Sequence, residues 1–295
     1  MMIDLVTHVG RVPDSGETLV GERFEMGFGG KGANQAVMAR LLGAEVAMVG
    51  CLGDDAYGEM TIENFASFDI DTTHVHRVPG SSGVAPIWVE SDGSNRIIIV
   101  PGANRDLTPE QAARAVRELA EVTVVVGQLE IPQEVTAAGF AAARERDAIT
   151  ILNPAPAAPL DADLLSLSTW LIPNEVEFET LAGQPPDDDA VLVSFASDTG
   201  TCLLVTLGTE GVALVSDSGA VTRIPAPQVD VVDTTGAGDA FVGAFAFGLA
   251  RGMHPLDAIR LGNDCASDSV TRPGTQSSFP DTTRSAELSA RVLRH

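Results

Sequence analysis

The sequence predicts an α/β fold in which helices flank a mostly parallel central sheet, with a small β-sheet annex from the early part of the chain. From residue 108 onward, short β-branched apolar runs alternate with helical segments. Such runs are typical of strands buried on both faces of a parallel sheet. Earlier in the chain, polar and apolar residues partly alternate, which indicates sheets with one face in water. No repeat and no long linker divides the 295 residues, so we expect a single domain over residues 1–295.

The first hundred residues supply the strands of the annex. The segments with partial alternation and flanking turns are 18–28, 83–90 and 96–100. We therefore place the annex strands at about 3–28 and 83–100. Between these strands, residues 31–42 have a helical pattern, and residues 45–50 are predicted to form a strand.

The later part of the chain supplies the parallel sheet and its helices. A helix begins after Thr108, because Thr108 is a good N-cap, Pro109 fits the first turn and Gln111 can complete a capping box. The predicted buried strands are 122–126, 148–152, 169–172 and 202–207. The further predicted helices are 133–146, 175–182, 237–251 and 255–270.

Composition favours a soluble, cytoplasmic protein. No apolar run reaches the length of a membrane span, and the first residues lack a charged segment followed by an apolar one. Three widely spaced cysteines predict neither a disulfide framework nor a zinc site. The net charge of −23 fits either an ordinary solvated surface or adaptation to high salt. It disfavours nucleic acid and anionic membranes as partners, so an anionic ligand needs local donors.

A glycine-rich stretch, residues 27–36, contains Lys31, the only lysine of the chain. It formally matches the dinucleotide-binding pattern G-x-G-x-x-G, with Asp54 at a suitable distance for a ribose-binding acid. That pattern needs a buried parallel strand before the glycines, and residues 22–26 are too charged for one. A Walker-type phosphate loop is excluded, because Gly32 follows the lysine where Ser or Thr is required. A dehydrogenase is therefore a minor alternative.

A second glycine run opens the predicted helix 237–251. Gly236, Ala237 and Gly238 leave backbone N–H groups free at the positive end of the helix dipole, which makes an anion site. Asp239 lies in the first turn, where a carboxylate can simply stabilise the helix start. Next to an anion site, it can instead accept the proton of a hydroxyl that attacks a phosphoryl group. This combination points to phosphoryl transfer.

These two runs resemble the signatures of the ribokinase family of sugar kinases, also called phosphofructokinase-B-type kinases. The signatures are residues 29–36 and 233–239, and further similar motifs lie in the family's order at 15–18, 102–104, 128–130, 153–156, 173–175 and 206–208. The resemblance covers essentially the whole chain and implies a three-layer αβα core plus a small β-sheet lid. The family begins with a buried core strand that has already ended where Met1 and Met2 stand, so we expect either that this first core strand is missing or that residues are missing upstream of Met1.

The resemblance also implies roles for particular residues. Asp239 is implied to be the base that activates the sugar's 5-hydroxyl, while Gly236, Ala237 and Gly238 form the anion hole for the γ-phosphate. The implied sugar-binding residues are Met2, Asp4, Gly30, Lys31, Asn34, Glu130 and Asp239. Lys31 suits this place because a flexible point charge among glycines can approach both a sugar and a phosphate.

By the same resemblance, ATP is the phosphate donor, with Mg²⁺ and a monovalent cation, usually K⁺. The implied ATP-binding residues are Asn174, Thr206, Gly208, Gly211, Gly238 and Asn263. Asn174 and Glu177 match the motif that organises Mg²⁺, largely through water. The implied K⁺ positions are Asp233, Thr235, Ser269, Arg272, Gly274 and Ser278. A homodimer formed through paired lid sheets is a further expectation.

The choice of sugar depends on Met2. Ribokinases carry Asn two residues before the sugar-binding aspartate, which here corresponds to Asp4. A thioether cannot donate a hydrogen bond, so Met2 forms an apolar wall that favours a CH₂ over a 2-hydroxyl. Burying an unsatisfied hydroxyl costs about 1–3 kcal/mol. The 2-deoxyribokinase branch, which the sequence also resembles, has methionine at this position, and we therefore expect 2-deoxy-D-ribose to be phosphorylated on its 5-hydroxyl.

Other functions remain as alternatives at this stage. Ribokinase, acting on D-ribose, is the alternative within the pentose kinases, and adenosine or fructose 6-phosphate are minor ones. A catalytically silent sugar or nucleotide sensor is the non-enzyme alternative, favoured only by the expected loss of the first core strand. The presence of both Asp239 and Lys31 argues against a silent protein.

Overall fold

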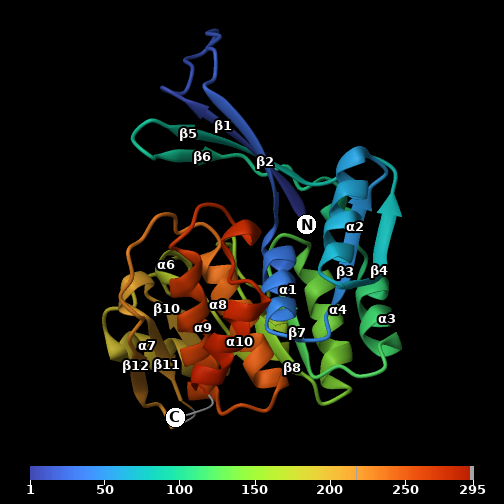
Figure 1. Ribbon diagram of the computed structural model, residues 1–295. Coiled ribbons are helices and arrows are strands. Elements are labelled where there is room, and N and C mark those ends of the chain that lie inside the picture. Colours follow the sequence, from blue (N-terminus) through green and yellow to red (C-terminus); the bar gives the residue numbers. More distant parts are fainter. Residues whose placement is uncertain (217, 293–295) are drawn as a thin grey trace.

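The computed structural model describes residues 1–216 and 218–292. It has a body of helices and strands, from which a small sheet projects (Figure 1). Among the described residues, no helix combines the length and the apolar character that crossing a membrane requires.

The projecting sheet, which we call the lid sheet, has the strand order β2-β1-β5-β6. Its strands are β1 (Met2–Val9), β2 (Arg23–Gly29), β5 (Val84–Glu90) and β6 (Asn95–Ile97). β1 runs antiparallel to β2, with Met2 opposite Gly29, and parallel to β5. The last strand is shorter than predicted: beyond Ile97, the contacts with β5 are the bond from Ile98 N to Pro86 O and the isolated bridge between Val100 and Val84.

The body contains a six-stranded sheet of order β12-β11-β10-β9-β8-β7. The strands are β7 (Val124–Gly127), β8 (Ile149–Leu152), β9 (Trp170–Leu171), β10 (Cys202–Thr206), β11 (Val212–Val215) and β12 (Val221–Ile224). β7 to β10 are parallel, as the continuous apolar runs predicted, and β11 and β12 add an antiparallel edge.

Ten helices surround the strands in the described residues. They are α1 (Lys31–Leu41), α2 (Ala56–Ser67), α3 (Pro109–Glu118), α4 (Gln133–Arg144), α5 (Ala162–Leu167), α6 (Glu175–Ala182), α7 (Asp189–Thr199), α8 (Ala237–Ala250), α9 (Pro255–Ser269) and α10 (Thr282–Val292). The predicted capping box of α3 is present, with reciprocal bonds between Thr108 and Gln111.

Two apolar clusters make this a three-layer core. On one face of the sheet, Ile151 and Leu204 pack with Phe241 and Phe245 of α8 and with Ile259 of α9. On the other face, strand residues pack against the buried side chains of α4, α5, α6 and α7, which are Phe140, Leu164, Phe178 and Leu192. The helices therefore cover both faces, as expected for an αβα arrangement.

The core strands do not form one continuous sheet. β3 (Ala47–Gly53) and β4 (Asp71–Val78) pair with each other in a separate parallel sheet. Within residues 1–216 and 218–292, no strand joins β3 to β7, since β1 pairs with β2 and β5 in the lid sheet. This gap matches the expectation that the first core strand is missing.

Candidate active site

The start of α8 forms an open, electropositive corner. Gly236 precedes the helix with φ 78°, a left-handed conformation that glycine adopts without strain, and its carbonyl accepts from Ala240 N at 2.8 Å. No atom lies within 4 Å of the place where a Cβ on Gly238 would stand. The N-terminal N–H groups therefore adjoin free space, as an anion site requires.

The start of α1 converges on the same place. α1 follows β2 directly, and Gly30 makes the turn with φ 91°. A Cβ on Gly30 would lie 2.9 Å from the backbone of both Met1 and Met2, so only glycine fits between the lid sheet and α1. The backbone N–H of Lys31 donates to Glu130 Oε2 at 2.8 Å, which ties this turn to the loop after β7.

Asp239 is buried between these two helix starts. Its carboxylate accepts from Asn34 Nδ2 and from Gln35 Nε2, both at 2.9 Å. Burial and the nearby Glu130 raise the pKa of Asp239. Lys31 and the two amide donors act in the opposite direction. The result is a carboxylate with an increased affinity for a proton, next to an anion site, as a general base for phosphoryl transfer needs.

Asp4 of β1 faces this centre from the lid sheet. Burial raises the pKa of Asp4 to about 6, and the charges of Glu130 and Asp239 add to the rise. Three carboxylates thus surround one small region that Lys31 also faces. Carboxylates accept hydrogen bonds, so the arrangement suits a ligand with several hydroxyl groups.

Asn174 and Glu177 form a capping box at the start of α6. Asn174 N donates to Glu177 Oε2 at 2.9 Å, and Glu177 N donates to Asn174 Oδ1 at 2.8 Å. Burial raises the pKa of Glu177, while its charge interacts with Lys31 and Asp239, which places it beside the site. The described residues contain no group of three His, Cys, Asp or Glu side chains that could hold a metal. The carboxylate of Glu177 and the amide oxygen of Asn174 are oxygen ligands of the kind that fit Mg²⁺ held through water and substrate phosphates.

The positions predicted to bind ATP lie beside Asn174. An isolated bridge pairs Asn174 with Thr206, and Leu207 N donates to Gly211 O across the turn that contains Gly208. Gly211 has φ 94° and packs against Ile224 and Ala226. Asn263 donates to Ile224 O and Pro225 O, at 3.2 and 3.3 Å. Asn174 and Thr206 thus lie side by side, and Gly211 and Asn263 both contact the segment 224–226.

The positions predicted to bind K⁺ are held together behind the anion site. Asp233 accepts from Thr235 N and Gly274 N, both at 2.9 Å. Ser269 ends α9, from which the chain continues to Arg272, and the Arg272 side chain donates to Ser278 O. Carboxylate and carbonyl oxygens at these positions match the donors that alkali cations prefer.

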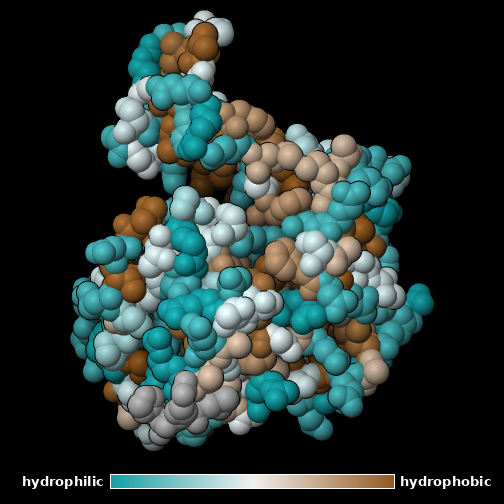
Figure 2. Space-filling view, in the orientation of Figure 1, coloured by the Kyte–Doolittle hydropathy of each residue, from teal (hydrophilic) through white to brown (hydrophobic). Residues whose placement is uncertain are grey.

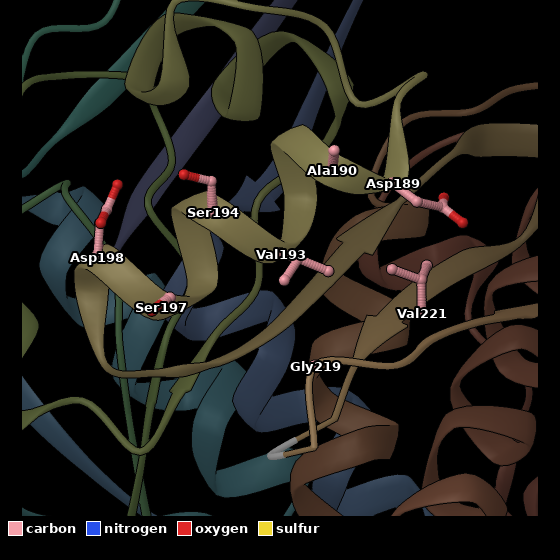
Figure 3. Close-up of a pocket in the computed structure, with 8 residues that line it drawn as sticks. All are labelled: Asp189, Ala190, Val193, Ser194, Ser197, Asp198, Gly219 and Val221. Carbon is pink, nitrogen blue, oxygen red and sulfur yellow. The ribbon is translucent and has the colours of Figure 1, made fainter.

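A hollow beside α7 does not belong to this site (Figure 3). It is lined by Asp189, Ala190, Val193, Ser194, Ser197, Asp198, Gly219 and Val221. None of these residues is among those that the sequence predicted to bind sugar, ATP or cations.

Comparison with known proteins agrees with this geometry. The pattern of the pfkB family of carbohydrate kinases matches residues 1–282. The chain belongs to this family. It is 41% identical over 285 residues to a deoxyribokinase of Salmonella typhi, covering 95% of this chain and 93% of that protein. It is 40% identical over 279 residues to a ribokinase of Lactococcus lactis, covering 94% and 91%. A structure of Arabidopsis thaliana ribokinase complexed with ribose and ATP matches with TM-score 0.90 and 31% identity, covering 97% of this chain and 95% of that one.

The family assignment decides between the alternatives that the sequence left open. Membership in a family of ATP-dependent carbohydrate kinases makes the chain an enzyme rather than a silent sensor. The dehydrogenase alternative is wrong, because the glycine run 27–32 begins within β2 (Arg23–Gly29), an antiparallel edge strand of the lid sheet. A dinucleotide site would need a buried parallel strand there.

Several amide side chains of the site received no role from the sequence. Gln35, Gln128 and Asn153 stand inside the motifs that identified the family, and Gln276 and Asn64 stand outside them. Of these residues, Gln35 could have been predicted from the sequence most easily, because it directly follows Asn34 in the same helix turn. Gln128 and Gln276 reach the site only through the tertiary fold.

The raised pKa of Asp4 predicts a stability cost. Because its pKa in the folded protein, about 6, exceeds the ordinary 3.8, the Asp4 contribution to stability falls as pH rises between these values. We expect Asp4→Asn to raise the Tm above pH 6 and to lose this advantage toward pH 4, in thermal scans at several pH values.

Asp92→Asn is the matched control in the lid sheet, because hydrogen bonds from Ser94 lower the pKa of Asp92 instead. This control is not expected to raise the Tm at pH 7. A Tm of Asp4→Asn at or below that of the unsubstituted protein at pH 8 would contradict the role of burial.

Proposed function

We propose that this kinase transfers the γ-phosphate of ATP to the 5-hydroxyl of a pentose, with 2-deoxy-D-ribose as the preferred sugar. The observation that carries the proposal is the buried Asp239 carboxylate, with its raised pKa, at the open N-terminus of α8. The 5-oxygen attacks the γ-phosphorus, its proton passes to Asp239, and the bond between the γ-phosphorus and the bridging oxygen of ADP breaks. N–H groups at Gly236, Ala237 and Gly238, with Lys31, stabilise the charge on the transferred phosphoryl group.

The preference for 2-deoxyribose rests on Met2. Met2 is only 4% exposed and is hydrogen-bonded into β1 opposite Gly29, so it is not a loose chain end. Side chains two apart on a strand share one face, which puts Met2 on the same face as Asp4. An apolar side chain there offers no partner to a 2-hydroxyl. The similarity to a deoxyribokinase and to a ribokinase is nearly equal, which keeps D-ribose as the second candidate.

Cations complete the proposed reaction. Asn174 and Glu177 would hold Mg²⁺ through water, and the ion would supply positive charge to the phosphate groups. The oxygens around Asp233 and Gly274 would hold K⁺ and so keep the start of α8 in place. The use of ATP supports a cytoplasmic location.

A homodimer through the lid sheets is part of the proposal. Phe24 and Met26 of β2 are 62% and 45% exposed and lie two residues apart, so they share a face of the sheet. Apolar groups are also visible on the outer part of the lid sheet in Figure 2. A second copy of this sheet is the occupant that would bury such a surface symmetrically.

Asp239→Asn tests the base. An amide cannot take up the hydroxyl proton, so we expect ADP release with 2-deoxyribose to fall by about 10³-fold or more, while ATP binding measured by calorimetry stays within about threefold. Full turnover in this variant would remove Asp239 as the base.

Met2→Asn tests the choice of sugar. The new amide can pair with a 2-hydroxyl, so kcat/KM for ribose relative to 2-deoxyribose should rise about tenfold or more. The assay measures ADP release with Mg²⁺ and KCl over a range of both sugars. An unchanged ratio would show that Met2 does not contact the sugar.

Phe24→Ser combined with Met26→Ser tests the dimer. Removing both apolar groups should convert a dimer to a monomer in sedimentation experiments, because the burial that drives association is lost. Val20→Ser is the matched control, since Val20 is 94% exposed and lies outside the strands. A dimer that survives the double substitution would place the interface elsewhere.

A further inference from the structure

Both oxygens of the Asp239 carboxylate accept from side-chain amides of α1. Asn34 donates to Oδ2 and Gln35 to Oδ1, each at 2.9 Å. The two amides are each 3% exposed, so water does not compete effectively for them. Each amide also has an oxygen that must find a donor in this buried place.

The oxygen of Asn34 finds its donor in a chain that leads to α2. Gln276 Nε2 donates to Asn34 Oδ1 at 3.0 Å, and Asn64 Nδ2 donates to Gln276 Oε1 at 2.9 Å. Gln276 lies in a short 3₁₀ turn (Gln276–Ser278) and is 9% exposed, while Asn64 is half-buried on α2. Three amides thus follow one another in the same direction and end on the carboxylate.

The oxygen of Gln35 finds its donor in a second chain. Gln128 Nε2 donates to Gln35 Oε1 at 2.5 Å. Gln35 Nε2 also donates to Asn153 Oδ1 at 3.1 Å, and Asn153 Nδ2 donates to Ile172 O at 2.8 Å. Because a backbone carbonyl can only accept, Asn153 must turn its oxygen toward Gln35.

The direction of both chains follows from the same rule. An ionised carboxylate only accepts, so Asn34 and Gln35 must present nitrogen to Asp239 and oxygen to the next amide. We propose that Gln276, supported by Asn64, and Gln128 are positioning residues for catalysis, which hold the Asn34 and Gln35 amides with their N–H groups on the Asp239 carboxylate. This inference rests on the proposed role of Asp239 as base.

The alternative is that these amides only fill space in a polar interior. The two interpretations predict different effects on kcat when residue 276 is changed from a hydrogen-bond donor to an acceptor. Under the proposal, an acceptor at position 276 forces oxygen against oxygen, either at Asn34 or, after an amide flip, at Asp239. The charged groups that act on Asp239 are otherwise unchanged: Lys31 and Glu130 directly, with Asp4 and Glu177 around them.

Gln276→Glu is the deciding variant. The new side chain keeps the length of Gln276, but as a carboxylate it only accepts hydrogen bonds and cannot donate to Asn34 Oδ1. At pH 8, well above the ordinary pKa of a carboxyl group, we expect its kcat with 2-deoxyribose to be about tenfold lower than that of the unsubstituted kinase, with the KM for ATP within about threefold.

Three further variants separate polarity from shape. Gln276→Met keeps the length of the side chain without a donor or an acceptor oxygen, so its kcat should fall by less than that of Gln276→Glu. Gln133→Glu on α4, bonded to Pro159 and Asp161, is the control for an added charge and should behave as the unsubstituted kinase. Gln128→Glu should repeat the loss of kcat through the second chain.

Equal losses of kcat in Gln276→Glu and Gln276→Met would overturn the positioning role, and so would an unchanged kcat in Gln276→Glu. Absence of turnover in the unsubstituted kinase with both 2-deoxyribose and ribose would instead overturn the proposed function. The two failures are therefore distinguishable in the same assay.

Discussion

The candidate site depends on one constraint, which is that the Asp239 carboxylate is buried away from water. Burial makes charge on Asp239 costly, and the protein offsets the cost with Lys31, two amide donors and the positive end of α8. Neutral amides stabilise the charge less than a close cation would, so the carboxylate keeps an affinity for a proton. That balance is what a base in phosphoryl transfer requires.

The balance is possible because two helix starts, distant in sequence, meet closely. α1 and α8 pack with Gly243 against α1, where a Cβ would lie 2.5 Å from Gln35 O. At the start of α1, Gly30 lets the backbone pass next to the first residues of the lid sheet, Met1 and Met2. The absence of two side chains therefore brings the lid sheet, the amides of α1 and the carboxylate of α8 into one place.

Much of this could be predicted from the sequence, and the reasons differ between elements. The strands β7, β8 and β10 were visible as continuous apolar runs, because burial on both faces removes polar residues. Asp239 and Lys31 were visible because glycine runs mark backbone that approaches a ligand. The contacts of Gln276 with Asn34 and Asn64 were not, since they join residues 242 and 212 positions apart and amides have no periodic pattern.

The single lysine gives the kinase an unusual chemical property. Lys31 carries the only ε-amine of the whole chain, and the amino group of Met1 is buried against Asn104 Oδ1 at 3.0 Å. Reagents that acylate lysine side chains therefore find one target in this sequence, and that target stands between the sugar and phosphate positions of the proposed reaction. The single lysine therefore also makes the site a selective attachment point for a covalent label or inhibitor, without any engineered cysteine.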